Sequence, residues 1–383
     1  MRIGINTLFL IPSKVGGSET YLRKTLAEMV RLDESVEYVL FCNRENAGTF
    51  GEVERPNVRE VACDVTATSR PRRILYEQFA LPKLVERHGC DVLWSPGYTA
   101  PLRLGCPSVV STLDMQYRHF PEDFSTLALW ATRFLVPRAA RKAAAVLTLS
   151  EYSKREIVEF CRVPAERVHV VYLAADEAAG GDIRDEEQRA VLEGLGIERG
   201  YVLTVANAWP HKNVPALVRA HALVRAHAVL PDAGARRLVI VGIRGRGMKK
   251  VSAAIARSAR GERIVVTGWL SERELWVLYR NAGVFAFPSL FEGFGLPVLE
   301  AMAAGVPVVS SNASSLPEVY GDAALSFDPT DEPAMADAIA RVLSDRALAR
   351  DLVERGRRNL ARFSWRRTAE QTLRVIVQAA RAS

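Results

Sequence analysis

Short apolar segments rich in β-branched residues alternate along the chain with segments whose apolar residues recur at helical spacing. In the first half, runs such as RIGINTLFLI, YVLFC, SVVST and AVLTL have the character of buried strands. The segments between them carry helical periodicity at 18–32, 75–88, 127–142 and 151–160. This alternation is typical of β-α-β units, in which crossover helices join parallel strands. The pattern therefore predicts an α/β fold built on a parallel sheet.

The same alternation starts again near residue 200 with YVLTV, RLVIV, RIVVT, VFAF and VPVV, separated by helix-period segments. Residues 174–199, which lie between the two series, are charged and rich in alanine and glycine, so they are predicted to form a linker. The expected organisation is a first Rossmann-like domain at 1–173 and a second at 200–364. Because open parallel sheets bind ligands at the carboxyl ends of their strands, we expect a cleft that draws residues from both domains.

Composition narrows the function classes. Of the 383 residues, 49% are hydrophobic and 25% charged, and the net charge of +7 favours anionic ligands such as nucleotides or lipid surfaces. No zinc-finger, RRM or helix-turn-helix pattern occurs, so nucleic acid is not an expected partner. The five cysteines are widely spaced and form no CxxC, which predicts free thiols in a reducing cytosol. No apolar run is long enough for a membrane span, so the expected location is cytoplasmic.

The predicted helix at 127–142 has two interpretations, one of which is a contact with a membrane surface. Residues 127–142 mix Leu, Trp and Phe with four basic residues, as in helices that lie on an anionic membrane surface. The same apolar residues would serve equally well against a sheet, and Pro137 interrupts the helix. The favoured interpretation is a core-facing helix, with peripheral contact at the inner face of a membrane as the alternative.

The strongest chemical signal is FPSLFEGFGLPVLEAM, residues 287–302, with two glutamates eight residues apart. Glu292 lies in a glycine-bearing loop, and Glu300 falls about one turn inside the following helix. Gly293 and Gly295 allow close approach of the backbone to a ligand. The amides of Phe294, Gly295 and Leu296 belong to a helix N-terminus that suits a diphosphate. The glutamates are placed to accept hydrogen bonds from hydroxyls on either side of it, as in a nucleotide sugar.

Two further loops contain candidate ligand contacts. In ANAWPHKN, residues 206–213, Lys212 precedes a predicted helix and can neutralise a leaving diphosphate. In VGGSE, residues 15–19, Gly17 can present its amide to a phosphate or a sugar, and Ser18 is a candidate helix cap. A tight turn without a ligand is the alternative for the second loop.

The 287–302 segment resembles the E-x7-E signature of retaining GT-B glycosyltransferases of the family-4 type, and the likeness covers most of the chain. The resemblance implies that Glu292 binds the sugar hydroxyls, Glu300 the ribose hydroxyls and the 294–296 amides the phosphates. It also implies a backbone contact of Leu270 with the base, and a terminal helix at 365–383 that returns to the first domain. The implied donor-binding residues are Gly16, Gly17, Asn207, Lys212, Leu270, Glu292, Gly293, Phe294, Gly295, Leu296 and Glu300.

The chain departs from the family pattern at three positions. Asn207 and His211 stand where relatives carry arginine or another cation, and Arg244, Arg246 or Lys249 could supply the missing charge. Leu113, before Asp114, replaces a histidine that contacts the donor sugar in relatives. Asp114 is kept as a candidate contact with the sugar or the acceptor.

The resemblance implies a hexosyltransferase of the EC 2.4.1 type that retains anomeric configuration, with Glu292 and Lys212 in the catalytic roles. Mannose from GDP-mannose is the first expected donor group, and a saccharide or lipid-linked saccharide is the acceptor. There are two alternatives. The donor is a UDP-sugar, or the protein binds nucleotide sugars without catalytic activity because Leu113 replaces the histidine. No Asp-x-Asp triplet occurs, so neither a metal nor another cofactor is expected. An oxidoreductase is disfavoured, because no GxGxxG follows a predicted strand.

Overall fold

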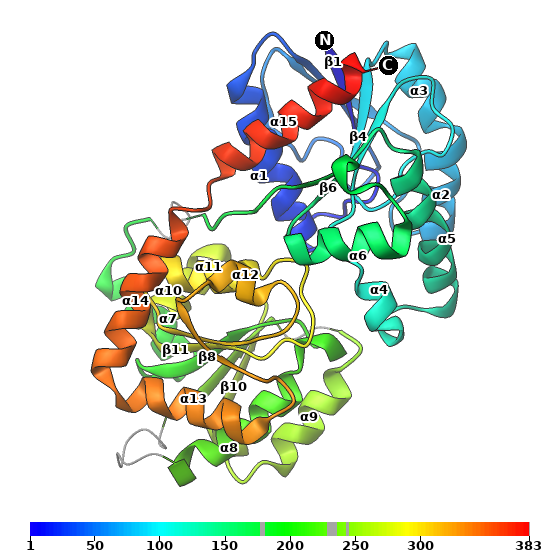
Figure 1. The fold of residues 1–383 in the computed structure, drawn as a ribbon. Coiled ribbons are helices and arrows are strands. Elements are labelled where there is room, and N and C mark those ends of the chain that lie inside the picture. Colours follow the sequence, from blue (N-terminus) through cyan, green and yellow to red (C-terminus); the bar gives the residue numbers. More distant parts are fainter. Residues whose placement is uncertain (177–180, 228–235, 243–244, 383) are drawn as a thin grey trace. The chain divides into compact units, whose positions relative to one another are not determined.

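The computed structural model describes residues 1–176, 181–227, 236–242 and 245–382. These residues form two compact units (Figure 1). Unit 1 comprises 1–117, 125–173 and 364–383, and unit 2 comprises 118–124 and 174–363. The expected boundaries therefore differ in three places. Residues 118–124 belong to unit 2, the segment predicted to be a linker also belongs to unit 2, and Ser364 belongs to unit 1.

Unit 1 is built on a seven-stranded parallel sheet in the order β3-β2-β1-β4-β5-β6-β7. The first strand ends at Asn6, earlier than the apolar run predicts, because Leu8 and Leu10 lie in a buried turn. Asn43 fixes this turn by donating to the carbonyl oxygens of Leu8 and Leu10 at 3.0 and 2.8 Å. The strands are β1 (Arg2–Asn6), β2 (Glu37–Cys42), β3 (Val58–Ala62), β4 (Val92–Ser95), β5 (Ser108–Ser111), β6 (Ala145–Thr148) and β7 (Val168–Val170).

The helices of unit 1 cover this sheet. The predicted helix at 75–88 is two helices that meet at Ala80, with Pro82 in the first turn of the second, where its missing N–H costs no hydrogen bond. The helices are α1 (Gly17–Leu32), α2 (Arg70–Phe79), α3 (Leu81–Arg87), α5 (Thr126–Lys142), α6 (Glu151–Cys161) and α15 (Trp365–Arg381), while the short α4 (Gln116–His119) leads into unit 2.

The C-terminal helix is part of unit 1 although it follows unit 2 in sequence. Figure 1 shows α15, in red, along α1, in blue, and α15 also contacts β4, β5 and β6. Ala369 and Ile376 are fully buried, and the Thr368 hydroxyl donates to the Tyr172 carbonyl oxygen at 2.6 Å. The burial of this stripe holds the helix on the first sheet.

Unit 2 is built on a six-stranded parallel sheet in the order β10-β9-β8-β11-β12-β13. The sequence pattern predicts only helices beyond residue 310, and this is wrong at 324–327, where a four-residue strand pairs with β12 from Val308↔Ala324 onward. The strands are β8 (Tyr201–Val205), β9 (Leu238–Val241), β10 (Ile264–Gly268), β11 (Ala282–Phe287), β12 (Val308–Ser311) and β13 (Ala324–Phe327).

The predicted linker carries a helix that packs within unit 2. Asn281 in α10 donates to the Gln188 side chain of α7 at 2.9 Å, and Arg273 of α10 pairs with Glu187. These contacts explain why the segment is not a simple tether. The helices of unit 2 are α7 (Asp185–Gly194), α8 (Val214–His227), α9 (Met248–Arg257), α10 (Glu272–Asn281), α11 (Leu296–Ala303), α12 (Leu316–Tyr320), α13 (Glu332–Ser344) and α14 (Arg346–Leu360).

Two further expectations can be compared with the described residues. Among them, no helix combines the length and the apolar character that crossing a bilayer requires. The five cysteines are free thiols, as predicted, and all but Cys106 are buried. Burial raises the pKa of the Cys42 thiol to about 12, so this thiol is inert at neutral pH.

Candidate active site

The two loops that carry the strongest sequence signals meet at the centre of the second sheet. Strand order reverses between β8 and β11, and crevices at such reversals are where open α/β sheets bind ligands. The loop after β8 contains Lys212, and the loop after β11 contains Glu292. The amide of Leu290 donates to the carbonyl oxygen of His211 at 2.7 Å, which joins the two loops directly.

Lys212 and Glu292 form an ion pair, with 2.7 Å between Nζ and Oε1. Their side chains are only 19% and 11% exposed, so the attraction between them is screened less than at an open surface. The next residue, Asn213, adopts a left-handed conformation with φ 55° and donates to the Pro288 and Pro329 carbonyl oxygens. The sequence predicted separate roles for the lysine and the glutamate, whereas the structure shows that they are partners.

A serine-rich turn after β12 stabilises the Glu292 loop through hydrogen bonds. The Glu292 amide donates to Ser314 Oγ at 2.8 Å. Ser315 Oγ donates to the carbonyl oxygens of Glu292 and Phe294 at 2.9 and 3.0 Å. The sequence reasoning did not assign these serines a role in the site. The signal that could have found them is their position directly after β12, the strand that pairs with β11.

The start of α11 has the backbone geometry that the glycine spacing predicted. Gly295 has φ 107°, and a Cβ placed there would lie 2.5 Å from Leu316 Cδ2. Pro297 occupies the first turn of the helix, where its missing N–H leaves no hydrogen bond unmade, and the Val298 amide donates to the Gly295 carbonyl oxygen at 3.0 Å. Phe294 is buried edge-on against Phe363, with 5.8 Å between ring centroids. The amides of 294–296 are thus held in a rigid turn, and their contact with phosphate stays a prediction.

Glu300 lies inside α11 and accepts a hydrogen bond from the Tyr279 hydroxyl at 2.8 Å. The pKa of the Glu300 carboxyl is raised to about 7, mainly by burial and in smaller part by the negative charge of Glu272, while the Tyr279 hydrogen bond opposes the shift. Tyr279 was not predicted, because it belongs to α10 and nothing in its local spacing distinguishes it from a packed tyrosine. The hydrogen bond from Tyr279 orients the Glu300 carboxylate, which was predicted from the sequence to bind the ribose hydroxyls.

Residues 118–124, which we call the docked segment, pack against both loops of the site. His119 stacks on Phe291 with 4.9 Å between ring centroids, and Phe120 contacts the rings of His211 and Phe291. His211 Nδ1 lies 2.6 Å from Asp123 Oδ2, and both side chains are almost fully buried. These aromatic contacts explain why the docked segment belongs to unit 2. The sequence pattern did not indicate this contact of His119 with Phe291.

The remaining predicted residues of unit 2 lie on loops at the same edge of the sheet. Asn207 is exposed after β8, and Leu270 is half-buried after β10, next to a capping box of Ser271 and Glu274. Gly293 lies between Glu292 and the rigid turn at Gly295. Of the three proposed substitute cations, Arg246 and Lys249 are exposed and Arg244 lies outside the described residues.

In unit 1, the glycine pair lies at the start of α1, as predicted, with Gly17 as the first residue of the helix, but the cap is different. Gly16, with φ 61°, is the residue that caps α1, and Ser18 lies inside the helix, so the prediction of a Ser18 cap is wrong. A Cβ added at Gly16 or Gly17 would meet nothing within 4 Å. Glu19 accepts from the Ser13 amide at 2.8 Å and pairs with Arg23, which closes the loop from the other side.

Asp114 is held by neighbours in unit 1. It accepts hydrogen bonds from the Tyr98 hydroxyl and the Gln116 amide, each at 3.0 Å. Leu113 is buried, with 4% of its surface exposed, so this position contributes to the core. The loops after β1, which contains the glycine pair, and after β5, which contains Asp114, both lie at the carboxyl edge of the first sheet.

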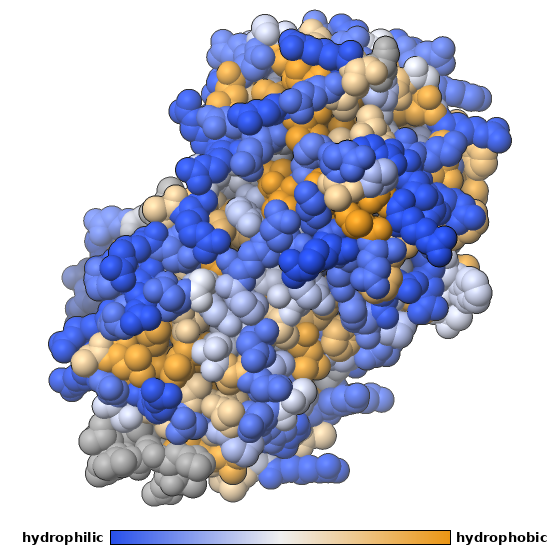
Figure 2. Space-filling model, in the orientation of Figure 1, coloured by the Kyte–Doolittle hydropathy of each residue, from blue (hydrophilic) through white to orange (hydrophobic). Residues whose placement is uncertain are grey.

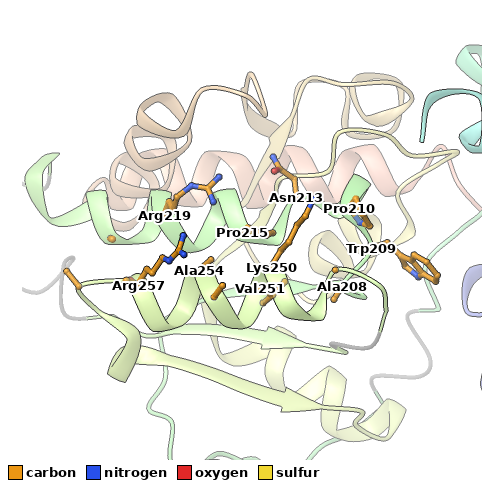
Figure 3. Close-up of a pocket in the computed structure, with 15 residues that line it drawn as sticks. Ala208, Trp209, Pro210, Asn213, Pro215, Arg219, Lys250, Val251, Ala254 and Arg257 are labelled. Atoms are coloured by element: carbon orange, nitrogen blue, oxygen red, sulfur yellow. The ribbon is translucent and has the colours of Figure 1, made fainter. Parts of the chain in front are cut away.

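A cavity of about 640 Å³ lies between α8 and α9 (Figure 3). Ala208, Trp209 and Pro210, from the loop after β8, line the cavity, whereas Lys212 and Glu292 do not. Arg219, on its rim, pairs with Glu332. The cavity is therefore next to the candidate active site and separate from it. Within the described ranges, no three His, Cys, Asp or Glu side chains are grouped to hold a metal ion.

Solved structures share this architecture. The chain matches sucrose-phosphate synthase from Thermosynechococcus elongatus with a TM-score of 0.79 at 20% identity, over the full length of both chains. It matches the glycosyltransferase WaaG, described as involved in lipopolysaccharide biosynthesis, with a TM-score of 0.71 at 13% identity, covering 98% and 99% of the two chains. Together with the two parallel sheets, these matches define the GT-B class of α/β proteins.

Two family models match consecutive parts of the chain. "Glycosyltransferase Family 4" matches residues 15–178, and "Glycosyl transferases group 1" matches residues 187–359. The chain belongs to this group-1, family-4 type of glycosyltransferase.

Curated relatives include several mannosyltransferases. The O-antigen chain mannosyltransferase B of Escherichia coli is 35% identical over 240 residues, 60% of each chain. The serotype-specific mannosyltransferase WbdA of Escherichia coli is 30% identical over 237 residues, which are 60% of this chain and 28% of WbdA. The chain thus spans less than two thirds of these relatives. The alpha-maltose-1-phosphate synthase of Mycolicibacterium smegmatis is 25% identical and is matched over 98% of both chains.

Proposed function

We propose that this protein transfers a hexose from a nucleotide sugar to a saccharide or lipid-linked saccharide, with retention of anomeric configuration. The observation that carries the proposal is the Lys212–Glu292 pair at the strand reversal, with the α11 amides and Glu300 following it in the same segment. Mannosyltransferases among the relatives support mannose as the sugar, and the donor that we propose is GDP-mannose.

Each part of the donor has a proposed partner. Glu300, oriented by Tyr279, accepts hydrogen bonds from the ribose hydroxyls. The amides of 294–296 hold the diphosphate at the start of α11, where the helix dipole favours negative charge. Glu292 binds the sugar hydroxyls, and Lys212, which the ion pair with Glu292 holds beside the sugar, neutralises the phosphate. Gly17 and Asp114 of unit 1 are proposed contacts for the sugar or acceptor, and Asn207 and Leu270 for the nucleotide.

The proposed reaction breaks the bond between the anomeric carbon and the phosphate oxygen. The sugar passes through an oxocarbenium-like state, which the Glu292 carboxylate stabilises. The acceptor hydroxyl bonds to the anomeric carbon on the face that the nucleotide leaves, and its proton moves to the departing phosphate oxygen. Lys212 and the α11 amides neutralise the charge that develops on this phosphate, which is the role a metal ion plays in other transferases. The products are a nucleoside diphosphate and the glycosylated acceptor.

The experiment that tests the proposal is a thermal-shift panel of GDP- and UDP-sugars followed by product analysis. A donor that binds only the folded state raises the melting temperature. GDP-mannose is expected to give the largest shift, and a UDP-sugar that gives a larger one would replace it. Incubation of the selected donor with oligosaccharide acceptors in excess EDTA is expected to yield product. Product formation that requires added Mn²⁺ or Mg²⁺ would contradict the role of Lys212.

A second candidate function rests on Leu113. Because this residue is buried where relatives carry a sugar-contacting histidine, the protein could bind nucleotide sugars without transferring them. The two functions are separated by measuring donor turnover with and without acceptor. A transferase consumes donor faster when acceptor is present, whereas a silent binding protein shows a thermal shift and no turnover in either case.

A further inference from the structure

The helix α5 presents a row of large apolar side chains to solvent. Leu127 and Trp130 are each 70% exposed and Phe134 is 51% exposed. Their spacing of three and four residues places them on one face of the helix. The preferred core-facing interpretation of this helix is therefore wrong for these residues. The contact with the core is made instead by Leu135, Val136, Ala139 and Ala140.

The neighbouring helix adds to this surface. Leu75 and Phe79 of α2 are 59% and 70% exposed. Arg70 of α2 donates to Thr132 of α5 at 2.9 Å, and both helices lie along the same flank of unit 1 in Figure 1. Of the ten exposed large hydrophobic residues among those described, five come from α2 and α5. Elsewhere hydrophilic residues cover most of the face drawn in Figure 2, with apolar residues in separate areas.

Positive charge accompanies the apolar row. The sequence of α5 contains Arg133, Arg138, Arg141 and Lys142 and no acidic residue. All four are exposed, and the Arg138 guanidinium lies 3.6 Å from the centroid of the Phe134 ring. The exposed face is thus mainly apolar towards the N-terminal end of the helix and mainly cationic towards its C-terminal end. We call Leu127, Trp130 and Phe134 with these four cations the α5 face.

We propose that the α5 face docks on an anionic lipid bilayer. Exposed tryptophan, phenylalanine and leucine enter the boundary between headgroups and acyl chains, while basic residues are attracted to the negative surface. A second copy of this chain is a poorer partner, because pairing two α5 faces would gather the four cations of each copy in one interface, and α5 has no acidic residue to pair with them. The proposal does not depend on the transfer reaction, but it fits an acceptor that is itself anchored in a membrane.

The test measures co-sedimentation of the full chain with vesicles of phosphatidylcholine alone and with 30% phosphatidylglycerol. The protein is expected to bind the anionic vesicles about tenfold more strongly than the neutral ones, and less at high salt. The variant Leu127→Ser/Trp130→Ser/Phe134→Ser is expected to lose about tenfold in binding, as is Arg138→Glu/Lys142→Glu. The matched control is Trp269→Ser, which removes a similarly exposed aromatic residue, 66% exposed, from unit 2.

The outcomes separate this proposal from its competitors. Equal binding to both vesicle types, or equal loss in the Trp269→Ser control, would overturn it. Light scattering that shows a dimer converted to a monomer by the triple serine variant, without vesicle binding, would identify a second copy as the occupant. Donor turnover with a water-soluble saccharide is expected to be unchanged in the triple variant. Because turnover is measured without vesicles, a failure of the proposed transferase activity is distinguishable from a failure of membrane docking.

Discussion

Two helices of this protein begin after glycine-containing loops, and the two loops differ in how they are held. Before α1 in unit 1, the space around Gly16 and Gly17 is empty to at least 4 Å from an added Cβ. Before α11 in unit 2, Gly295 packs against Leu316, and Ser315 holds the carbonyl oxygens on either side of Gly293. Both loops follow a strand at a reversal of strand order, so position alone does not explain the difference.

This difference in packing and hydrogen bonding indicates which loop has a fixed conformation before the ligand binds. Around Glu292, hydrogen bonds from the serine turn and the pairing with Lys212 fix the backbone and one carboxylate oxygen. Such preorganisation is what electrostatic stabilisation of a transition state requires. The open space at Gly17 is instead suited to close approach of a ligand to the backbone. We therefore expect substitutions at the second loop to affect chemistry and stability, and those at the first to affect mainly ligand contacts.

The largest expected effect is at Glu292. Glu292→Ala should lower donor turnover by about 100-fold or more, because it removes the carboxylate that stabilises the sugar and leaves Lys212 without its partner. Affinity for the free nucleoside diphosphate, measured by calorimetry, should change little. A double-mutant cycle with Lys212→Ala should show non-additive losses. Equal loss of turnover and of nucleoside diphosphate affinity would contradict a role directed at the sugar.

The next effect is on stability, and it compares the two loops directly. Gly295→Ala should destabilise the protein by about 1–3 kcal/mol, because φ 107° is unfavourable for a residue with a Cβ and the methyl would meet Leu316. Gly17→Ala is the matched control, with open space and an ordinary φ, and it should change the free energy of unfolding by less than about 1 kcal/mol. Thermal and urea unfolding measure both. Similar losses in the two variants would remove the distinction between the loops.

A third prediction uses the pKa of Glu300, which burial raises to about 7. Because the unfolded chain releases this proton at lower pH, the contribution of Glu300 to stability is complete below pH 4.5 and falls as pH rises towards 7. Glu300→Gln lacks this titration. The melting temperature of the variant should therefore rise relative to that of the wild type as the pH increases from 5 to 7.5. A difference in melting temperature that stays constant with pH would show that Glu300 titrates normally.

The same variant should weaken nucleotide binding. The ribose hydroxyls donate most strongly to an ionised carboxylate, so Glu300→Gln should lose about 1–3 kcal/mol of nucleoside diphosphate affinity at pH 8. The loss should shrink at pH 5.5, where the carboxyl of the wild type is mostly protonated. Calorimetry at both pH values tests this, and an unchanged affinity at pH 8 would remove Glu300 from the donor site.

The smallest expected effect is that of Gly17→Ala on transfer. A methyl group at this open position should reduce turnover several-fold if a ligand approaches the Gly17 amide, with melting temperature unchanged. Ser18→Ala serves as the neighbouring control, because Ser18 lies inside α1 and does not cap it. Full activity of Gly17→Ala would show that the open loop is only a turn.

The sequence by itself determined the α/β class, the alternation of most strands and helices, and the positions of Glu292, Gly295 and Glu300 along one loop and helix. It could do so because these features depend on local periodicity and on the conformational freedom of glycine. The short strands β3 and β13 were missed, since four or five residues carry too little periodicity to distinguish them from their surroundings.

Only the tertiary structure decided which side chains meet. Tyr279, Ser314 and the docked segment reach the site because of strand order and helix packing, which bring together residues far apart in sequence. It also decided that Lys212 pairs with Glu292 and that the apolar residues of α5 face solvent. A helical period shows which residues share a face, but whether that face is covered depends on what packs against it.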